Sequence, residues 1–525
     1  MTKNLSHGGR QLAIAVSQAY EAGQTDYSME PLVRVDHTGA PLGRFQKGDA
    51  VVFCCRRGER EIELTEAFTD PEFSHFERCD LSPLNFIILT LYHEKFKDLP
   101  VAFLPSLIED TLAETASKAG LRQFHCSESE KFAHVTFFLN GGNHQSFAAE
   151  EDKRVPSPKG VPFDTIPELS LSQVSKEVIE AAGKDYDLIV TNFANGDVIG
   201  HTANREAKIQ CAEAVDIHLG EVVKAAEAAG YTILITADHG NLEELFTAEG
   251  KPHVSHTANP VPLIVIDSKG SHQQKPVDGK LADIAPTILH LLGINIPPSM
   301  TGVNLLPDRS EDEKEKVLLI ILDGWGIGKS DDSNPIFLAN TPVWDGLIQQ
   351  YGCARLEASG DAVGLQSGKT GNSEAGHLNI GAGRVVLQDD VRLDNALNDG
   401  SFYQNTIFLQ AIDGVKERQT RLHLIGLLTE KSSHGSIDYP LALLKMARDH
   451  GLDEVYLHLI FDGRSTEPGS APALLEKLEQ SMANIGIGQV VTGIGRGIAL
   501  DRDGNYARIK KAYDAFVRGD GQYYQ

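Results

Sequence analysis

The chain has 525 residues, more than one ordinary hydrophobic core accommodates, so two or more domains are expected. Its composition, with 41% hydrophobic and 23% charged residues, is that of a globular protein. The formal net charge of −25 argues against non-specific binding to nucleic acid or to an anionic membrane surface, although a local arginine cluster could still bind a small anion.

The N-terminal residues lack the apolar stretch and cleavage site of a signal peptide, and no apolar run reaches membrane-spanning length. The six cysteines are scattered without a C-x-x-C spacing, which argues against a cysteine zinc site and against a disulfide framework. We therefore expect a cytoplasmic protein with free thiols and with no membrane or nucleic-acid partner.

Short β-rich runs alternate with helical patterns along nearly the whole chain. Strands are predicted at residues 50–53, 133–139, 186–193, 231–238, 261–267, 317–323, 422–428 and 454–462. Residues 202–230 carry a helical pattern that ends on a glycine, a common C-cap signal. This alternation is typical of α/β domains with mostly parallel sheets.

The polar stretch PDRSEDEKEK at residues 307–316 indicates a linker. The residues before it are typical of the closing helix and tail of a domain. The run VLLIILD after it is typical of the first strand of an open α/β sheet, which often ends in a functional carboxylate. Two hypotheses account for this order: a fusion of two independent domains, or a circular permutation in which the linker joins the original termini.

Aspartates and histidines follow several of the predicted strands, in the motifs NFANGDVIGHT, ITADHGN, HTANPVP and LDGWG. Oxygen and imidazole ligands without thiolate favour Mn²⁺, Zn²⁺ or Mg²⁺. Each residue alone has a structural explanation, such as a helix cap, a turn or a packed ring. Their joint place at strand ends, where open α/β sheets hold their sites, predicts a metal site. The candidates are Asp197, His201, Asp238, His239, His256 and Asp323.

Ser373 lies in the glycine-bounded segment SGKTGNSEAGHLNIGAG, at the predicted start of a helix. Backbone N–H groups and the helix dipole at such a position favour a bound phosphate. A hydroxyl beside a divalent cation also loses its proton readily and becomes a nucleophile. The alternative is a plain capping serine.

A second set of residues is suited to a phosphorylated carboxylic acid, because arginine forks bind carboxylate and phosphate through two hydrogen bonds. Its arginines lie mostly in glycine-rich turns after predicted strands, although each alone could be a solvated surface residue. The set consists of Arg57, Arg60, Lys131, His434, Arg464, Arg496 and Arg502.

Together these motifs resemble the cofactor-independent (2,3-bisphosphoglycerate-independent) phosphoglycerate mutases of the alkaline phosphatase superfamily. The resemblance rests on LDGWG, TGNSEAGH, EKFAHVTFFLNGG, NFANGDVIGHT, ITADHGN and HTANPVP and extends over almost the whole chain. It implies a two-domain α/β fold, with an alkaline-phosphatase-like α/β/α sandwich at 79–387 and a smaller α/β transferase domain built from 1–78 and 388–525. The family begins with the LDGWG segment, whereas here the later part comes first, so the resemblance implies a circular permutation.

The resemblance also implies a reaction and roles for the candidates. Ser373 would take the phosphoryl group of 3-phosphoglycerate, giving a phosphoserine and glycerate, and return it to the 2-hydroxyl to give 2-phosphoglycerate, a step of glycolysis and gluconeogenesis. The domains would close around glycerate to exclude water. Two Mn²⁺ ions are implied, with Co²⁺, Zn²⁺ or Mg²⁺ as alternatives, and a monomer is expected. One ion would be held by Asp197, His201 and His256, and the other by Asp238, His239, Asp323 and Ser373. The substrate would be bound by Arg57, Arg60, Lys131, His434, Arg464, Arg496 and Arg502.

The chain departs from the family pattern at the second set. Ser465 stands where the family has an aspartate after the arginine of its G-R-D turn, and RRGER carries Glu59 for an aspartate, with Arg56 as a competitor of Arg57. Two rival functions are a metal-dependent phosphomonoesterase, or another phosphomutase of the superfamily such as a phosphopentomutase. A third is a non-catalytic protein that binds metal or a phospholigand.

Overall fold

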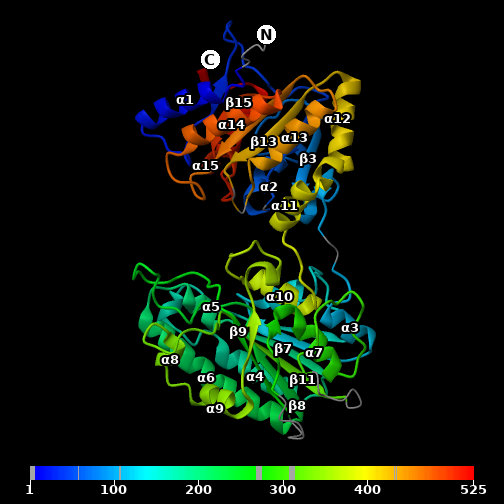
Figure 1. Cartoon of the computed structure of the whole chain (residues 1–525), viewed down its shortest axis with the longest axis vertical. Coiled ribbons are helices and arrows are strands. Elements are labelled where there is room, and N and C mark those ends of the chain that lie inside the picture. The colour runs from blue at the N-terminus through cyan, green and yellow to red at the C-terminus, as the bar shows by residue number, and fades with distance from the viewer. Residues whose placement is uncertain are drawn as a thin grey trace. The chain divides into compact units, whose positions relative to one another are not determined.

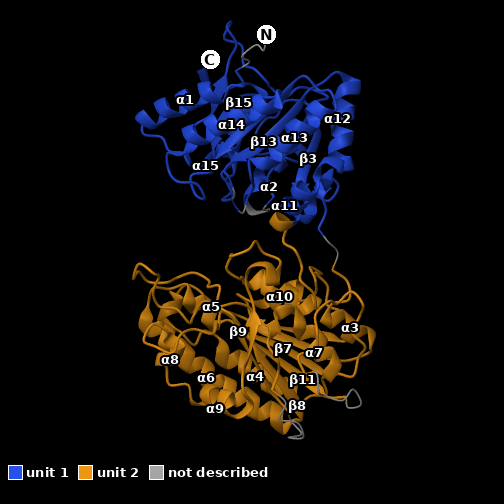
Figure 2. Cartoon of the chain, in the orientation of Figure 1, with its two compact units in different colours: residues 1–105, 392–525 blue, residues 106–391 orange. Residues whose placement is uncertain are grey.

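The computed structural model describes residues 6–56, 58–105, 108–267, 275–306, 314–430, 432 and 434–525 (Figure 1). The chain divides into two compact units (Figure 2). Unit 1 consists of residues 1–105 and 392–525, and unit 2 consists of residues 106–391. Each unit contains an eight-stranded sheet with helices, so the expected two-domain α/β class is confirmed. No helix in the described part of the chain combines the length and apolar character needed to cross a membrane.

Unit 2 is built on a sheet in the order β10-β12-β9-β8-β11-β7-β5-β6. Most neighbouring strands in it run parallel, and only the pairs β8–β9 and β9–β12 are antiparallel. Its strands are β5 (Gln123–Glu128), β6 (Glu150–Val155), β7 (Leu188–Phe193), β8 (Tyr231–Thr236), β9 (Val261–Ile266), β10 (Gly279–Lys280), β11 (Lys316–Leu322) and β12 (Ala354–Glu357).

Helices cover the sheet of unit 2 in two groups that contact different sets of neighbours. Helices α4, α6 and α9 contact one another or the strands on one side, and α3, α7 and α10 form the other group, as an α/β/α sandwich requires. The α-helices are α3 (Leu112–Lys118), α4 (Leu171–Ala182), α5 (Asn195–Gly200), α6 (Arg205–Ala228), α7 (Ile284–Leu291), α8 (Pro335–Leu338), α9 (Pro342–Tyr351) and α10 (Ser373–Ala382). Shorter helical turns are η2 (His134–Phe138), η3 (Phe163–Thr165), η4 (Leu281–Asp283) and η5 (Gly360–Val363).

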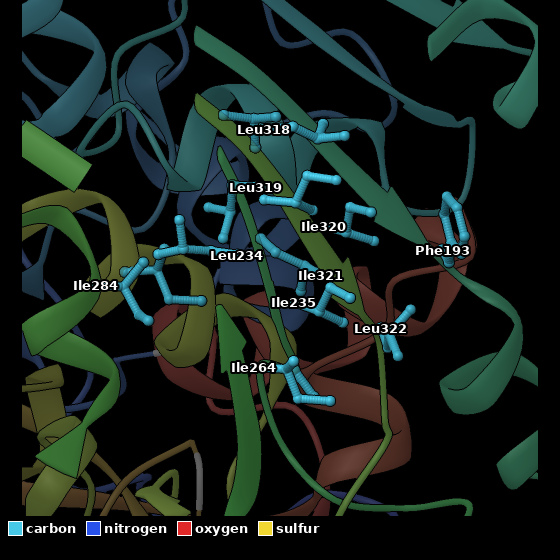
Figure 3. Close-up of a cluster of buried hydrophobic side chains, with 14 of the residues drawn as sticks. Phe193, Leu234, Ile235, Ile264, Ile284, Leu318, Leu319, Ile320, Ile321 and Leu322 are labelled. Atoms are coloured by element: carbon cyan, nitrogen blue, oxygen red, sulfur yellow. The ribbon is translucent and has the colours of Figure 1, made fainter. Parts of the chain in front are cut away.

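The core of unit 2 forms around β11, whose side chains from Val317 to Leu322 are at most 1% exposed (Figure 3). A strand covered on both faces needs apolar side chains in both directions, which explains the unbroken apolar run rather than an alternating one. Full burial of each such side chain contributes about 1.5–3 kcal/mol. The strand that follows the predicted linker therefore lies in the interior of the sheet, buried like its neighbours β7 and β8.

β11 also joins residues from both sides of the predicted linker into one sheet. Ile320 is in register with Thr191 of β7 and with Ile235 of β8, and both partners precede the linker in the chain. Most of the linker, residues 307–313, lies outside the described residues. The described strands show that unit 2 is one folded body and not two independent domains.

Unit 1 has a second sheet, in the order β16-β1-β15-β14-β13-β2-β3-β4, in which only β1 and β15 pair antiparallel. Its strands are β1 (Leu32–Arg34), β2 (Ala50–Phe53), β3 (Asn85–Thr90), β4 (Val101–Phe103), β13 (Leu422–Leu428), β14 (Val455–Phe461), β15 (Gln489–Gly495) and β16 (Gln522–Tyr524). Its helices are α1 (Gly9–Glu21), α2 (Gly58–Thr69), η1 (Glu94–Phe96), η6 (Ser401–Gln404), α12 (Thr406–Arg418), α13 (Asp438–Asp449), α14 (Ala471–Ile485), α15 (Arg496–Ala499) and α16 (Tyr506–Val517), and α11 (Asp389–Asp399) begins at the boundary of the units.

The predicted strand at 133–139 is wrong. Its centre, His134–Phe138, is a π-helical turn (η2), in which the Leu139 N–H donates to the His134 carbonyl at 3.1 Å. The two best-buried apolar side chains of the segment, Val135 and Leu139, are four residues apart. That is a helical spacing, and the β-branched and aromatic composition of the run obscured it.

Candidate active site

The polar residues predicted at strand ends meet at one edge of the unit 2 sheet. Asp323 follows β11, Asp238 follows β8, and Asp197 lies in α5 directly after β7. These three strands are neighbours and parallel, so their carboxyl ends share an edge. Gly324, with φ of +73°, makes the turn after Asp323, and its backbone N–H donates to Asp238 Oδ1 at 3.2 Å.

Ser373 is the first residue of α10, as the sequence predicts. The N-cap is Asn372, whose side chain accepts a hydrogen bond from the Ala375 N–H. Since Asn372 performs the capping, the Ser373 hydroxyl is left for other partners. Ser373 is therefore not the capping residue of this helix, which rules out the alternative of a plain capping serine.

Three groups surround the Ser373 hydroxyl. Its Oγ lies 2.6 Å from Lys131 Nζ, 2.9 Å from His239 Nε2 and 3.3 Å from Asp323 Oδ1. Lys131 Nζ also contacts Asp197 Oδ2 at 2.7 Å and Asp323 Oδ1 at 2.8 Å. Ser373 and Lys131 are 6% and 5% exposed, so these contacts form in a nearly dry environment.

A second cluster lies beside the first and shares Asp197 with it. His201 Nε2 and His256 Nε2 lie 3.2 Å and 3.0 Å from Asp197 Oδ1, and 3.1 Å from each other. The Nδ1 atoms of these rings face the carbonyl oxygens of Val254 at 3.0 Å and Gly371 at 2.8 Å. In the neutral rings the proton therefore belongs on Nδ1, and the Nε2 lone pairs point into the cluster.

The charges of the cluster oppose one another. Burial lowers the pKa of Lys131, but the charges of Asp323, Asp197 and Asp238 outweigh it and raise this pKa above its ordinary value. Burial raises the pKa of Asp197, but the charge of Lys131 and hydrogen bonds from His201 and His256 hold it well below its ordinary value. Burial and the charge of Asp238 raise the pKa of Asp323. The charged form of Asp197 is thus stabilised by its neighbours, whereas that of Asp323 is not.

The donors fit divalent cations. Three sets of residues at this edge each bring their ligand atoms within 4.8 Å of one another. They are Asp197 with His201 and His256, Asp197 with His239 and Asp323, and Asp238 with Asp323 and His377. Among the described residues, Asp238 Oδ2 is buried without a hydrogen-bond partner, a costly state that a bound cation would relieve. The imidazoles of His201 and His256 present their Nε2 atoms as metal-bound histidines do, with Nδ1–H on a backbone carbonyl.

Sequence reasoning missed several residues that hold the site together. His377 and Asn192 are fully buried, and Asn192 Nδ2 donates to Asp323 Oδ2 at 2.7 Å and faces His377 Nε2 at 3.0 Å. The Glu243 carboxylate accepts the N–H groups of Asn241 at 2.8 Å and Gly326 at 3.1 Å, so it ties two site loops together. His377 lies four residues after Ser373 on the same helix, a spacing that could have indicated it.

The described members of the second predicted set, apart from Lys131, lie in unit 1, most of them at the carboxyl ends of four neighbouring parallel strands. His434 follows β13, Asp462 and Arg464 follow β14, Arg496 follows β15, and Arg60 lies in α2 after β2. Such an edge is where open α/β sheets gather binding groups. Arg57 lies outside the described residues.

Two members of this set are buried against acids. His434 Nδ1 lies 3.0 Å from Glu61 Oε1, and burial raises the pKa of this glutamate although His434 opposes the shift. Arg496, 5% exposed, forms an ion pair with Asp462. Such pairs fix both side chains before any ligand arrives.

The other described members differ in burial, and Arg60 is buried as well. Arg60 Nη1 donates to the Leu500 carbonyl at 3.0 Å, Arg464 and Arg502 are exposed, and the Arg464 guanidinium lies 5.5 Å from the Tyr27 ring centroid. The Ser465 N–H donates to Asp462 Oδ2 at 3.1 Å. Ser465, which stands where the family has an aspartate, therefore closes the turn that bears Arg464.

Comparison with known families gives two matches to family models. Residues 35–296 match the model described as the Metalloenzyme superfamily, and residues 393–525 match the model described as the BPG-independent PGAM N-terminus. The chain is similar to 2,3-bisphosphoglycerate-independent phosphoglycerate mutases. These matches support the family that the motifs resemble.

Curated relatives of that name share 40–44% identity with parts of the chain. The mutase of Desulforudis audaxviator is 44% identical over 294 residues, which are 56% of this chain and 57% of the relative. The mutase of Methanococcoides burtonii is 40% identical over 300 residues, again 56% and 57%. The chain thus spans a little over half the length of the relatives it matches. A solved phosphoglycerate mutase of Leishmania mexicana aligns over 52% of this chain and 53% of its own, with 31% identity and a TM-score of 0.41.

Proposed function

We propose that the protein is a phosphoglycerate mutase that interconverts 3-phosphoglycerate and 2-phosphoglycerate without 2,3-bisphosphoglycerate. One observation carries the proposal. The Ser373 hydroxyl lies within 3.3 Å of an ammonium, an imidazole and a carboxylate at a helix N-terminus. This is the environment of an activated nucleophile for a phosphoryl group. The relatives named as mutases at 40–44% identity support the same reaction.

Ser373 is the proposed carrier of the phosphoryl group. Its Oγ forms a bond to phosphorus while the bond from phosphorus to the 3-oxygen of the substrate breaks, leaving glycerate. In the return step the 2-hydroxyl of glycerate attacks phosphorus and the serine hydroxyl is restored. Lys131 Nζ, beside Ser373 Oγ, stabilises the charge of the transferring group, because phosphoryl transfer depends chiefly on positioning and charge neutralisation.

Two divalent cations, Mn²⁺ in our proposal, complete the site. Asp197, His201 and His256 would hold one, and Asp238, His239, Asp323 and Ser373 the other. The cations would supply positive charge to phosphoryl oxygens and lower the pKa of the serine hydroxyl. Asp323 and Asp197 would then act as ligands, and Asn192, which donates to Asp323 Oδ2, would hold that carboxylate in place.

The basic set of unit 1 is the proposed binding site for the glycerate part of the substrate. Arginine side chains at a sheet edge suit the carboxylate of the substrate. The buried pairs His434–Glu61 and Arg496–Asp462 pre-orient two of its members. The proposed contacts are made by Arg57, Arg60, His434, Arg464, Arg496 and Arg502.

The chain is proposed to be a circular permutation of the family order. A model described as an N-terminus matches the last 133 residues, after the match to the Metalloenzyme superfamily, which supports a reversed order. The proposed phosphatase-like domain, 79–387, and transferase-like domain, 1–78 with 388–525, are supported in outline by compact units that divide after residues 105 and 391. A cytoplasmic monomer acting in glycolysis and gluconeogenesis completes the proposal.

The test is conversion of 3-phosphoglycerate by the purified, Mn²⁺-loaded chain without added 2,3-bisphosphoglycerate. The proposal expects 2-phosphoglycerate as the main product. Inorganic phosphate as the main product would instead favour the phosphomonoesterase. No reaction with 3-phosphoglycerate, together with turnover of a pentose phosphate, would favour another phosphomutase.

A further inference from the structure

A separate cluster of ligand-type side chains lies between β5 and the edge strand β6 of unit 2. It consists of His125, Glu150 and Asp152, each of which offers one ligand atom within 4.8 Å of the others. In the parallel register of the two strands, His125 pairs with Asp152 and Gln123 with Glu150, so all of these side chains project from one face of the sheet. None of the three belongs to the site around Ser373.

The imidazole of His125 is held as a metal ligand is held. It is fully buried, and its Nδ1 donates to the Val135 carbonyl at 2.8 Å. This bond fixes the proton on Nδ1 and leaves Nε2 with a lone pair. Among the described residues, Nε2 has no hydrogen-bond partner. A buried nitrogen without a hydrogen-bond partner is costly, and a bound cation would supply the missing partner.

Two oxygen atoms of the cluster are in a similar state, whereas both Glu150 oxygens accept hydrogen bonds, Oε2 from the Phe147 N–H at 2.7 Å. Within the described part of the chain, Asp152 Oδ1 and Asn140 Oδ1 are also buried without a hydrogen-bond partner. Asn140 belongs to the same cluster, because its Nδ2 donates to Glu150 Oε1 at 2.7 Å. The Glu150 side chain is fully buried, and its carboxylate lies 3.4 Å from His125 Nδ1, longer than a good hydrogen bond.

We propose that His125, Glu150 and Asp152 form a third divalent-cation site, for Zn²⁺. One imidazole and two carboxylates are a donor set that suits Zn²⁺, and the two negative charges are balanced by a doubly charged ion. Asp152 is half-buried on an edge strand, which gives the ion a path from solvent. The ion would tie β6 to β5 and, through Val135, to the η2 segment that follows Lys131.

The first test counts zinc. The whole chain is equilibrated with Zn²⁺, freed of unbound metal, and analysed by mass spectrometry for zinc atoms per chain. The variants H125Q and D152N should each carry one zinc fewer than the wild-type chain, whereas D332N, at an exposed aspartate, should equal it. Equal zinc content in all four folded proteins, as judged by circular dichroism, would overturn the proposal.

A second measurement needs no variant and holds even if the substitutions prevent folding. Crystals of the zinc-loaded wild-type chain are measured at the zinc absorption edge. The proposal expects an anomalous difference peak bounded by His125, Glu150 and Asp152. Density without anomalous signal at that position would mean water, and it would contradict a metal site, as would an empty position.

Discussion

Lys131 is the residue on which the charges of the candidate site depend most. Its ammonium lies within 2.8 Å of Asp197, Asp323 and Ser373. The change Lys131→Met keeps most of the length of the side chain and removes the positive charge that, in our proposal, stabilises the transferring phosphoryl group. We expect kcat to fall by about 10²–10³-fold, the usual effect of losing one charge-stabilising donor. Steady-state kinetics with 3-phosphoglycerate measure it.

The matched control is Lys153→Met in the same unit, because the Lys153 ammonium, among the described residues, forms only a partly exposed pair with Glu177 at 3.4 Å. Such pairs contribute about 0–1 kcal/mol, so kcat should stay at the wild-type value. Equal kcat in both variants would refute the role given to Lys131.

We expect Glu128, the last residue of β5, to make the stability of the chain depend on pH. Burial raises its pKa to about 7, although hydrogen bonds from Ser157 and the Ser170 N–H oppose the shift. Between about pH 4.5 and 7 the folded chain then binds a proton that the unfolded chain has lost, so this group's contribution to stability falls as pH rises. The contribution lost is on the order of 3 kcal/mol.

The change Glu128→Gln removes this titration. Relative to the wild-type chain, the variant should gain free energy of unfolding as the pH rises from 5 to 8, measured by denaturant unfolding at both pH values. The variant Glu180→Gln, at an exposed helix position, should show no such gain. If the free energies of unfolding of Glu128→Gln and the wild-type chain differ by the same amount at both pH values, the Glu128 carboxyl is not protonated in the folded chain as we expect.

At the scale of elements, helix α10 can lie close to η2 because Gly381 has no side chain. A Cβ built on Gly381 would lie 1.9 Å from the Leu139 carbonyl oxygen. Gly381→Ala should therefore destabilise unit 2 by about 1–3 kcal/mol, even though alanine is the better helix former. Thermal unfolding of the whole chain measures the effect.

Gly346 in α9 is the control for this change. No described atom lies within 4 Å of a Cβ built there. Gly346→Ala should stabilise the chain by about 0.5–1 kcal/mol. Destabilisation of similar size in both variants would mean that the contact between α10 and η2 is not the cause.

Much of the architecture could be predicted because long apolar strands carry a strong pattern. The runs at 317–323 and 422–428 appear as β11 and β13, and the aspartates after such strands meet because parallel strands end at one edge. The η2 turn was missed because its composition favours a strand. His377 and Asn192 were missed since a buried residue that orients another leaves no local pattern.

At the scale of the whole molecule, both units contain residues from both sides of the predicted linker. Cutting the chain at a protease site inserted within 307–316 should leave the two fragments associated, because β11 pairs with β7 and β8 across the cut. We expect the cut protein to elute as one species in size-exclusion chromatography and to keep its activity. Separation of the fragments without denaturant would contradict this.

The central claim is that the Ser373 hydroxyl carries the phosphoryl group between the two positions of the substrate. The most direct measurement is peptide mass spectrometry of the Mn²⁺-loaded chain, quenched with acid during incubation with 3-phosphoglycerate. The account predicts one phosphoryl group on Ser373, absent without substrate, and a loss of activity on the order of 10³-fold or more in Ser373→Ala with an unchanged fold. A phosphoryl group on another residue, or substantial turnover by Ser373→Ala, would contradict it.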